Sequence, residues 1–259
     1  LREVENEDLV DILLPTDENR LIEAITEVNQ NVAVVLQTAS AIEMPWIEKV
    51  KSVVECYFSG ESGGKATSNV LFGIVNPSGH LCESFPLHLC DNPSYEFFPG
   101  DGKTVEYKVG YRYYDTKEVD VLFPFGHGLS YTTFKYSNLR TEKGLSNFNV
   151  DSKSEIEILV DIENTGKVSG KTVAQLYVSD KTGKIERPLK ELKGFEKVHL
   201  EPDEVKTVKF TLNRRSFAYW CIDEHDWMVS SGDFMIIVGQ SSKDDQSLQL
   251  NLTINSTDK

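Results

Sequence analysis

Residues 155–164 read EIEILVDIEN, and apolar and acidic side chains alternate along them. A period of two is typical of a strand that buries one face and exposes the other. The same period recurs further along the chain, at residues 174–178, 208–212, 234–238 and 248–252. Turn sequences such as ENTGKVSG, EPDE and SSGD separate these segments. Roughly seven short strands of this kind predict an immunoglobulin-like β-sandwich over residues 133–259.

The part of the chain before the sandwich has a different pattern. Helix signals alternate with strand signals. Thr16 is expected to cap the first helix, whose apolar face consists of Leu21, Ile22, Ile25 and Val28. The runs NVAVVLQTA (residues 31–39), VVECYF (53–58) and SGHLCESFP (78–86) predict strands, the first buried on both faces. GGKATSNVLFG (63–73) predicts a helix that ends at Gly73. This alternation predicts a parallel or mixed sheet with helices outside it.

Residues 91–132 are rich in Gly, Pro and aromatic side chains, as in NPSYEFFPGDGK, VGYRYYD and LFPFGHGLSYTTF. Such a segment is too long and too aromatic for a plain linker, so it is expected to pack as a structured surface loop or to line a site. The predicted fold class is therefore α/β plus all-β. Residues 1–132 form part of an α/β sandwich domain, and residues 133–259 form the β-sandwich.

The composition excludes several classes of protein. The chain has 259 residues, 39% of them apolar and 26% charged, so it can bury a core. The net charge of −14 argues against nucleic acid and anionic membranes as partners. The apolar runs are too short to cross a bilayer. The acidic N-terminal sequence LREVENEDLV does not resemble a secretion signal, so a bacterial cytoplasmic location is predicted, with secretion as the alternative.

The four cysteines fit no zinc or haem spacing. They are predicted to be unpaired thiols, with disulfides as the alternative: Cys56, Cys82, Cys90 and Cys221. The histidines are too scattered for a metal site, and the sequence predicts neither a metal nor a cofactor. Glycosylation triplets at Asn251 and Asn255 are common by chance and carry no weight.

One Gly-rich segment imitates two catalytic motifs. GESGGK (residues 60–65) resembles a shortened phosphate-binding loop, but its spacing is wrong and no Ser or Thr follows Lys65. Gly60-Glu61-Ser62-Gly63-Gly64 also matches a nucleophile elbow literally. An elbow requires a downstream acid and His at strand ends, and the last two histidines, His199 and His225, fall in the predicted β-sandwich. The favoured interpretation is a Gly-rich turn between strand and helix.

Longer motifs point to a family. LFGIVNPSGHLCESFP, FPGDGKTVEY, VGYRYYD and FPFGHGLSYTTF together resemble glycoside hydrolase family three, the β-glucosidase family. NTGKVSGKTVAQLYVSD, ERPLKELKGFEKV and RSFAYW are similar to the fibronectin type III-like domain that closes many of these enzymes. The resemblance runs from about Leu13 to Gly239. It implies a (β/α)₈-type barrel that carries a nucleophilic Asp and is absent from this chain, and an α/β sandwich that carries the acid/base Glu.

One departure concerns that Glu. Relatives read Tyr-x-Glu-Gly-x-Phe before VGYRYYD, whereas here Tyr107 and Lys108 are followed directly by Val109. The resemblance implies that the acid/base Glu belongs to a segment missing between Lys108 and Val109, on a loop (residues 101–115) that points toward the barrel. A true deletion, giving an altered enzyme, is the alternative. Glu61 is the substitute candidate for the acid/base, and Glu106 is a weaker one.

The resemblance implies part of a retaining, exo-acting glycoside hydrolase, a β-glucosidase that releases glucose from non-reducing ends. The expected partners are a β-glucoside or oligosaccharide substrate, the barrel domain and a second copy of the protein. The chain alone is expected to be inactive. The alternative is a non-catalytic docking or carbohydrate-binding module. Against a carbohydrate-binding module, the sandwich aromatics are expected mostly at core positions: Phe195, Phe210, Trp220, Trp227 and Phe234.

Overall fold

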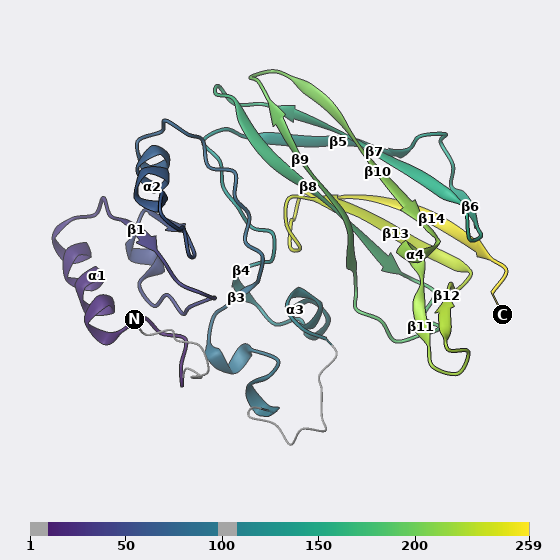
Figure 1. The fold of residues 1–259 in the computed structure, drawn as a ribbon, viewed down its shortest axis with the longest axis horizontal. Helices are drawn as coiled ribbons and strands as arrows, with labels where there is room; N and C mark the ends of the chain where they lie inside the picture. Colours follow the sequence, from purple (N-terminus) through teal and green to yellow (C-terminus); the bar gives the residue numbers. More distant parts are fainter. Residues whose placement is uncertain (1–9, 98–107, 259) are drawn as a thin grey trace.

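The computed structural model describes residues 10–97 and 108–258, and it has a smaller α/β part beside a larger β-sandwich (Figure 1). In the smaller part, β1 and β2 form a parallel pair, and β3 pairs with β4 in antiparallel fashion. The elements of this part are α1 (Thr16–Val28), β1 (Ala33–Leu36), η1 (Ile47–Lys49), β2 (Ser52–Glu55), α2 (Gly63–Leu71), β3 (Phe85–Pro86), η2 (Leu89–Asp91), η3 (Tyr95–Phe97), α3 (Tyr111–Lys117) and β4 (Val121–Phe123).

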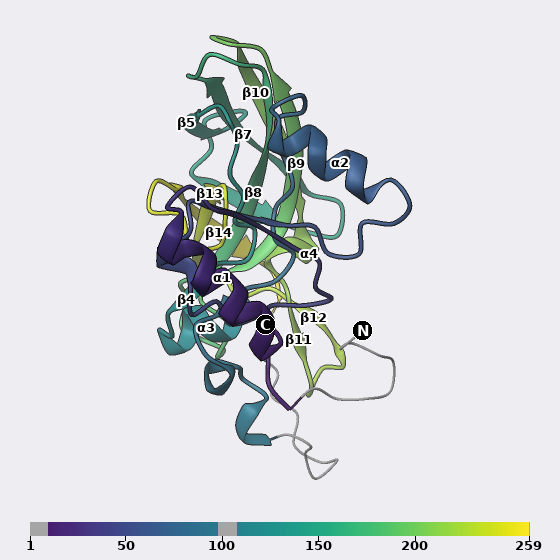
Figure 2. The same ribbon diagram turned by 90° about the vertical axis from the view of Figure 1, so that its left-hand side faces the viewer.

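Helix α1 forms where the sequence predicts it, but its start and its burial differ from the prediction. Pro15 occupies the N-cap position and Thr16 is the first helical residue, so the predicted Thr16 cap is wrong. Proline is tolerated at this end of a helix because its missing N–H removes no intrahelical hydrogen bond there. No side chain of α1 is buried, and Val28 is 86% exposed. In Figure 2, which looks onto this side of the molecule, α1 faces the viewer.

The parallel pairing of β1 with β2 confirms the predicted strand–helix–strand organisation, with Val34 opposite Val53. The expectation that the first strand is buried on both faces is wrong, because Ala33 is exposed and Val35 is 39% exposed. Only one side of this short sheet is covered by described residues. Strand β1 is therefore more apolar than its partial burial in this chain would require.

A small core holds the α/β part together around Trp46, which is fully buried. The indole Nε1 of Trp46 donates a hydrogen bond of 2.8 Å to Oδ1 of Asn19 on α1. This bond satisfies a buried donor and ties α1 to the loop before β2. The other buried members of this cluster are Leu36, Ala41, Ile42, Met44 and Phe85.

Helix α2 confirms the helix predicted over residues 63–73, and Gly73 follows it with a φ of +69°, a conformation that favours glycine. The strand predicted over residues 78–86 is much shorter, because only Phe85 and Pro86 have strand geometry. The rest of this segment is held by isolated backbone hydrogen bonds to the loop at residues 126–127, from Leu81 N to His127 O and from Gly126 N to Leu81 O.

The sandwich confirms the predicted all-β second half. Its two sheets have the orders β10-β7-β5 and β6-β14-β13-β8-β9, and β11 and β12 form a separate antiparallel pair. All pairs within the two sheets are antiparallel except β6–β14. The elements are β5 (Phe134–Thr141), β6 (Asn147–Val150), β7 (Glu155–Asn164), β8 (Gly170–Asp180), β9 (Glu191–Leu200), β10 (Val205–Asn213), α4 (Arg214–Phe217), β11 (Tyr219–Cys221), β12 (Asp226–Met228), β13 (Gly232–Gly239) and β14 (Leu248–Ser256).

The period of two in β7 is borne out residue by residue. Ile156, Ile158, Val160 and Ile162 are buried, and the acidic residues between them face outward or are half-buried. Strand β9 shows no such alternation, because residues 191–194 are all half-buried and residues 195–197 are all exposed.

Polar contacts join the two parts close to residue 133. Thr132 donates a 2.6 Å hydrogen bond to Asn164 of β7, and Asn76 donates a 3.0 Å bond to the carbonyl of Ser169. Strand β5 begins at Phe134. The domain boundary at residues 132–133 stays a prediction. In the described ranges, no helix is long and apolar enough to span a bilayer.

Candidate functional site

Polar side chains gather where the parallel strands β1 and β2 end. Glu55 is the last residue of β2, and its two oxygens accept hydrogen bonds from the Tyr57 backbone N–H (2.6 Å) and from the Thr38 hydroxyl (3.1 Å). Tyr57 has a φ of +46°, which is uncommon for a residue other than glycine. In open α/β sheets, ligands bind beyond the carboxyl ends of the strands, so this edge is a candidate site.

Glu83 lies at the same edge, beside the Tyr57 hydroxyl. Burial raises the pKa of Glu83, and the negative charge of Glu55 adds to the rise, although a backbone N–H of Ala41 and Tyr57 oppose it. Burial also raises the pKa of Tyr57, with Cys82 and Glu83 contributing. The thiol of Cys82 lies 4.0 Å from the Tyr57 oxygen. A half-buried carboxyl group with a raised pKa can hold a proton and donate it, which is what a general acid must do.

Sequence reasoning missed this group, called here the β1–β2 edge cluster: Thr38, Glu55, Tyr57, Cys82 and Glu83. One signal was available. Glu55 interrupts the otherwise apolar run VVECYF, directly at the end of a predicted parallel strand. Glu83 gave no comparable signal, because its position at this edge depends on how residues 78–86 cross the sheet.

The segment 108–117, which includes α3, is clamped against the sandwich. The backbone N–H of Leu192 donates a 2.8 Å hydrogen bond to the Tyr111 hydroxyl, and the Tyr111 ring packs edge-on against Tyr177 at 5.7 Å. Lys190 and Asp115 form an ion pair of 2.9 Å. The side chain of Lys108 is only 6% exposed, and its Nζ lies 2.7 Å from Glu186. This segment is therefore fixed by the loop and strand at residues 186–192.

The predicted catalytic residues are placed as follows. Glu61 lies exposed in the turn before α2 and makes no hydrogen bond or ion pair with any residue that the structure describes. Glu106 and Tyr107 lie outside the described residues. Lys108 is buried and Val109 is 55% exposed. The acid/base position at the Lys108–Val109 junction stays a prediction. Within residues 10–97 and 108–258, no group of His, Cys, Asp and Glu side chains could hold a metal ion. All four cysteines are unpaired.

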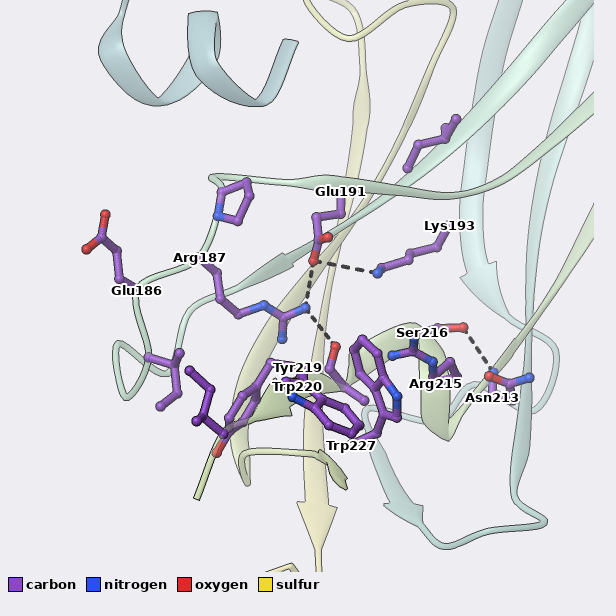
Figure 3. A pocket seen from close by; sticks show the side chains of 15 residues that line it. Glu186, Arg187, Glu191, Lys193, Asn213, Arg215, Ser216, Tyr219, Trp220 and Trp227 are labelled. Atoms are coloured by element: carbon purple, nitrogen blue, oxygen red, sulfur yellow. Dashed lines mark hydrogen bonds and ion pairs between the residues drawn. The ribbon is translucent and has the colours of Figure 1, made fainter. Parts of the chain in front are cut away.

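The sandwich contains a pocket of about 910 Å³, which Figure 3 shows from close by. The pair β11–β12, the helical turn α4 and residues 185–193 line this pocket, which is called here the β11–β12 pocket. The exposure of the sandwich aromatics corrects one expectation from the sequence. Phe210 and Phe234 do belong to the core, but Trp220 is 48% exposed and Phe195 is 68% exposed, so these two do not occupy core positions.

Two family models and many known proteins match the sequence of this chain. The family model "Glycosyl hydrolase family 3 C-terminal domain" matches residues 2–131, and the model "Fibronectin type III-like domain" matches residues 172–242. Thermostable beta-glucosidase B from Acetivibrio thermocellus is 51% identical, over 97% of this chain and 34% of its own length. An exo-alpha-(1->6)-L-arabinopyranosidase from Bifidobacterium breve is 41% identical, over 89% of this chain and 30% of its own length.

Solved structures agree with these matches. Beta-glucosidase from Kluyveromyces marxianus in complex with glucose superposes with a TM-score of 0.89 at 37% identity, covering 98% of this chain and 30% of that one. The GH3 beta-glucosidase of Bifidobacterium adolescentis gives a TM-score of 0.86 at 34% identity, covering 96% and 37%. The chain thus spans about a third of the length of the relatives that it matches.

Proposed function

Because the chain belongs to glycosyl hydrolase family 3 and carries that family's C-terminal domain followed by a fibronectin type III-like domain, we propose that it is the C-terminal third of a β-glucosidase. The observation that carries this proposal is the match of residues 2–131 to the family's domain model, together with 51% identity to a beta-glucosidase. The proposed substrate is a β-glucoside or oligosaccharide, from which the enzyme releases glucose at the non-reducing end.

The proposed chemistry is retaining hydrolysis, in which two carboxyl groups about 5–5.5 Å apart act on opposite sides of the scissile bond. One attacks the anomeric carbon, and the other protonates the leaving oxygen and later activates water. The nucleophilic Asp is assigned to a barrel domain outside this chain. The acid/base Glu is assigned to the loop that ends at Lys108 and Val109.

The clamp on segment 108–117 supports this assignment of the acid/base. A general acid must reach the glycosidic oxygen in a defined geometry, so the base of its loop should be rigid. Lys108, Tyr111 and Asp115 give the C-terminal base of the loop three contacts to the sandwich. Burial raises the pKa of Tyr114 on α3 to about 12, and the nearby charges of Asp91 and of Glu83 from the β1–β2 edge cluster add to the rise. The cluster is proposed to form part of the wall around the substrate.

An exposed apolar face supports the proposal that more of the protein packs against this chain. Leu21, Val28, Val35 and Phe72 are exposed on α1, on β1 and at the end of α2. A groove of about 570 Å³ runs between these elements. We assign this face to the first part of the α/β sandwich domain, within the two thirds of the relatives' length that this chain does not match. A bacterial cytoplasmic location is proposed for the whole enzyme.

A second candidate substrate comes from the relatives' names. Two Bifidobacterium relatives named exo-alpha-(1->6)-L-arabinopyranosidase are 41% and 39% identical to this chain, similar to the 41% of several beta-glucosidases. α-L-Arabinopyranose lacks the hydroxymethyl group of β-D-glucopyranose and has the opposite configuration at C4, so the two sugars differ at two positions of the ring. The test compares kcat/KM of the intact enzyme on 4-nitrophenyl β-D-glucoside and on 4-nitrophenyl α-L-arabinopyranoside. The proposal expects the glucoside to be preferred, and a preference for the arabinoside would replace it with the second candidate.

A further inference from the structure

The proposed hydrolysis makes no use of the β11–β12 pocket. Its volume of about 910 Å³ is within the range of small-molecule sites in proteins. Trp220 and Trp227 stand opposite each other across the two strands, with ring centroids 5.4 Å apart and planes inclined by 63°. In Figure 3 these two indoles lie on one side of the pocket, and Glu191 and Lys193 lie on the other.

The fold does not need both indoles for its core. Phe217 and Phe234 are fully buried beneath the hairpin and close the core there. Trp227 packs partly against this core, whereas Trp220 remains 48% exposed, and Ile222 next to the hairpin turn is 75% exposed. A large exposed aromatic side chain that rims a pocket is typical of a binding surface.

Polar groups surround the aromatic side of the pocket. The Arg215 guanidinium lies over the Trp227 ring, and it makes no hydrogen bond within the part of the chain that the structure describes. Glu191 accepts a 2.7 Å hydrogen bond from Arg187 and lies 3.5 Å from Lys193. Burial lowers the pKa of Lys193 despite this carboxylate. The pocket therefore combines an indole face with donors that retain bonding capacity and with a carboxylate acceptor.

These features together select one class of ligand. A pyranose ring has an apolar face of C–H groups, which stacks on an indole, and a rim of hydroxyls, which both donate and accept hydrogen bonds. A purely apolar ligand would displace water from Lys193 and Arg215 without replacing the hydrogen bonds that these side chains make to water. A small anion would meet the carboxylates of Glu186 and Glu191, which also line the pocket.

We propose that the β11–β12 pocket binds a neutral pyranose glycan, with one sugar ring stacked on Trp220 and its hydroxyls bonded to Lys193, Glu191 and Arg215. The choice of a glycan rests on the proposed function. The location agrees with it, because Glu186 and Glu191 line the pocket and also pair with Lys108 (2.7 Å) and Arg112 (3.9 Å) of the clamped segment. The pocket thus adjoins the base of the loop to which the acid/base is assigned.

The test is affinity electrophoresis of the intact enzyme in gels that contain soluble barley β-glucan. The catalytic site is first blocked covalently with 2-deoxy-2-fluoro-β-D-glucosyl fluoride, so that retardation reports other sites. The wild-type enzyme is expected to be retarded, and Trp220→Ala should weaken the apparent affinity at least fivefold. Phe195→Ala is the matched control, because Phe195 is another exposed aromatic side chain of the sandwich and lies outside the pocket. It should be retarded like the wild type.

Hydrolysis of 4-nitrophenyl β-D-glucoside by the unblocked protein checks that each variant is folded. If Trp220→Ala does not fold, Trp220→Gln serves as the second variant. Either of two results overturns the proposal: a blocked wild-type enzyme that migrates as in a glucan-free gel, or a folded Trp220 variant with wild-type retardation. Absence of β-glucoside hydrolysis by the unblocked wild-type enzyme counts instead against the proposed function, so the two failures are distinguishable.

Discussion

Asn164 is a single buried amide on which the junction between the two parts depends. Its Nδ2 donates hydrogen bonds to the carbonyls of Val168 (2.9 Å) and Leu200 (3.1 Å), and its Oδ1 accepts bonds from the Thr132 hydroxyl and the Gly166 backbone. Its side chain is inaccessible to solvent. No other residue type matches this set, because only an amide offers two donors and an acceptor of this size.

We expect Asn164→Ala to lower the free energy of unfolding by about 2–4 kcal/mol, because it leaves several buried polar groups without partners. Urea denaturation, monitored by tryptophan fluorescence, measures the change. Asn149→Ala is the control, since Asn149 shares only an exposed 3.0 Å bond with Asn255 and should cost less than about 0.5 kcal/mol. A loss at Asn164 no larger than that of the control would contradict the role given to this residue.

His127 makes the stability of the chain depend on pH. Burial lowers its pKa, and its ring stacks on Phe123 at 5.0 Å. The unfolded chain therefore binds a proton at a higher pH than the folded chain does. Stability should be constant above about pH 6.5, the ordinary pKa of His, and should fall as the pH decreases toward the lowered folded pKa. His80, whose pKa is also lowered by burial, acts in the same direction.

The variant His127→Gln tests this effect. It should reduce the loss of thermal stability between about pH 7 and pH 5, measured by calorimetry in buffers of constant ionic strength. His225→Gln is the control, because His225 is exposed on the β11–β12 turn. A His127→Gln protein with the same pH dependence as the wild type would show that this histidine does not contribute.

At the scale of elements, the hydroxyl of Tyr111 links α3 to the start of β9. Tyr111→Phe leaves the Leu192 N–H without its acceptor, so the free energy of unfolding should fall by about 1–2 kcal/mol. In the intact enzyme, kcat should fall more than KM changes, because the base of the catalytic loop is loosened. Tyr113→Phe is the control on the same helix, since its hydroxyl makes no hydrogen bond with described residues. Equal effects of the two variants would show that the Tyr111 hydroxyl does not fix the base of the catalytic loop.

Elements with a strong local signal were predictable from the sequence. The alternation of β7 and the helix α2 with its terminal Gly73 follow from residues close together in the chain. Strand β9 was not predictable in this way, because buried and exposed residues do not alternate along it. The cap of α1 was assigned wrongly because Pro15 and Thr16 both suit a helix start, and local sequence does not decide between them.

The candidate site was less predictable than the fold. The β1–β2 edge cluster combines residues from the ends of two strands with Glu83, which no local pattern connects to them. The β11–β12 pocket was missed because an aromatic residue in a short strand looks the same in sequence whether it faces the core or solvent. Trp220 is 48% exposed whereas Trp227 packs partly against the core, although the two residues pair with each other in one hairpin.

For the whole molecule, the apolar face on α1, β1 and α2 should make the isolated chain self-associate. Several large apolar side chains exposed on neighbouring elements favour association in water. Replacing Leu21 and Phe72 by Lys should shift the chain toward monomer in analytical ultracentrifugation. Val168→Lys, at an exposed apolar position on the sandwich, should have no such effect. If the double variant associates as strongly as the wild type, this face is not the contact.

The central claim is that this chain supplies one part of a glycosidase active site and depends on the rest of the enzyme for the other. The most direct measurement is the rate of 4-nitrophenyl β-D-glucoside hydrolysis by three samples: the purified 259-residue chain, the remaining N-terminal part of the enzyme, and the two co-expressed. The account predicts no turnover by either part alone and measurable turnover by the co-expressed pair. Turnover by the rigorously purified chain alone would contradict it, because a complete pair of catalytic carboxylates would then lie within these residues.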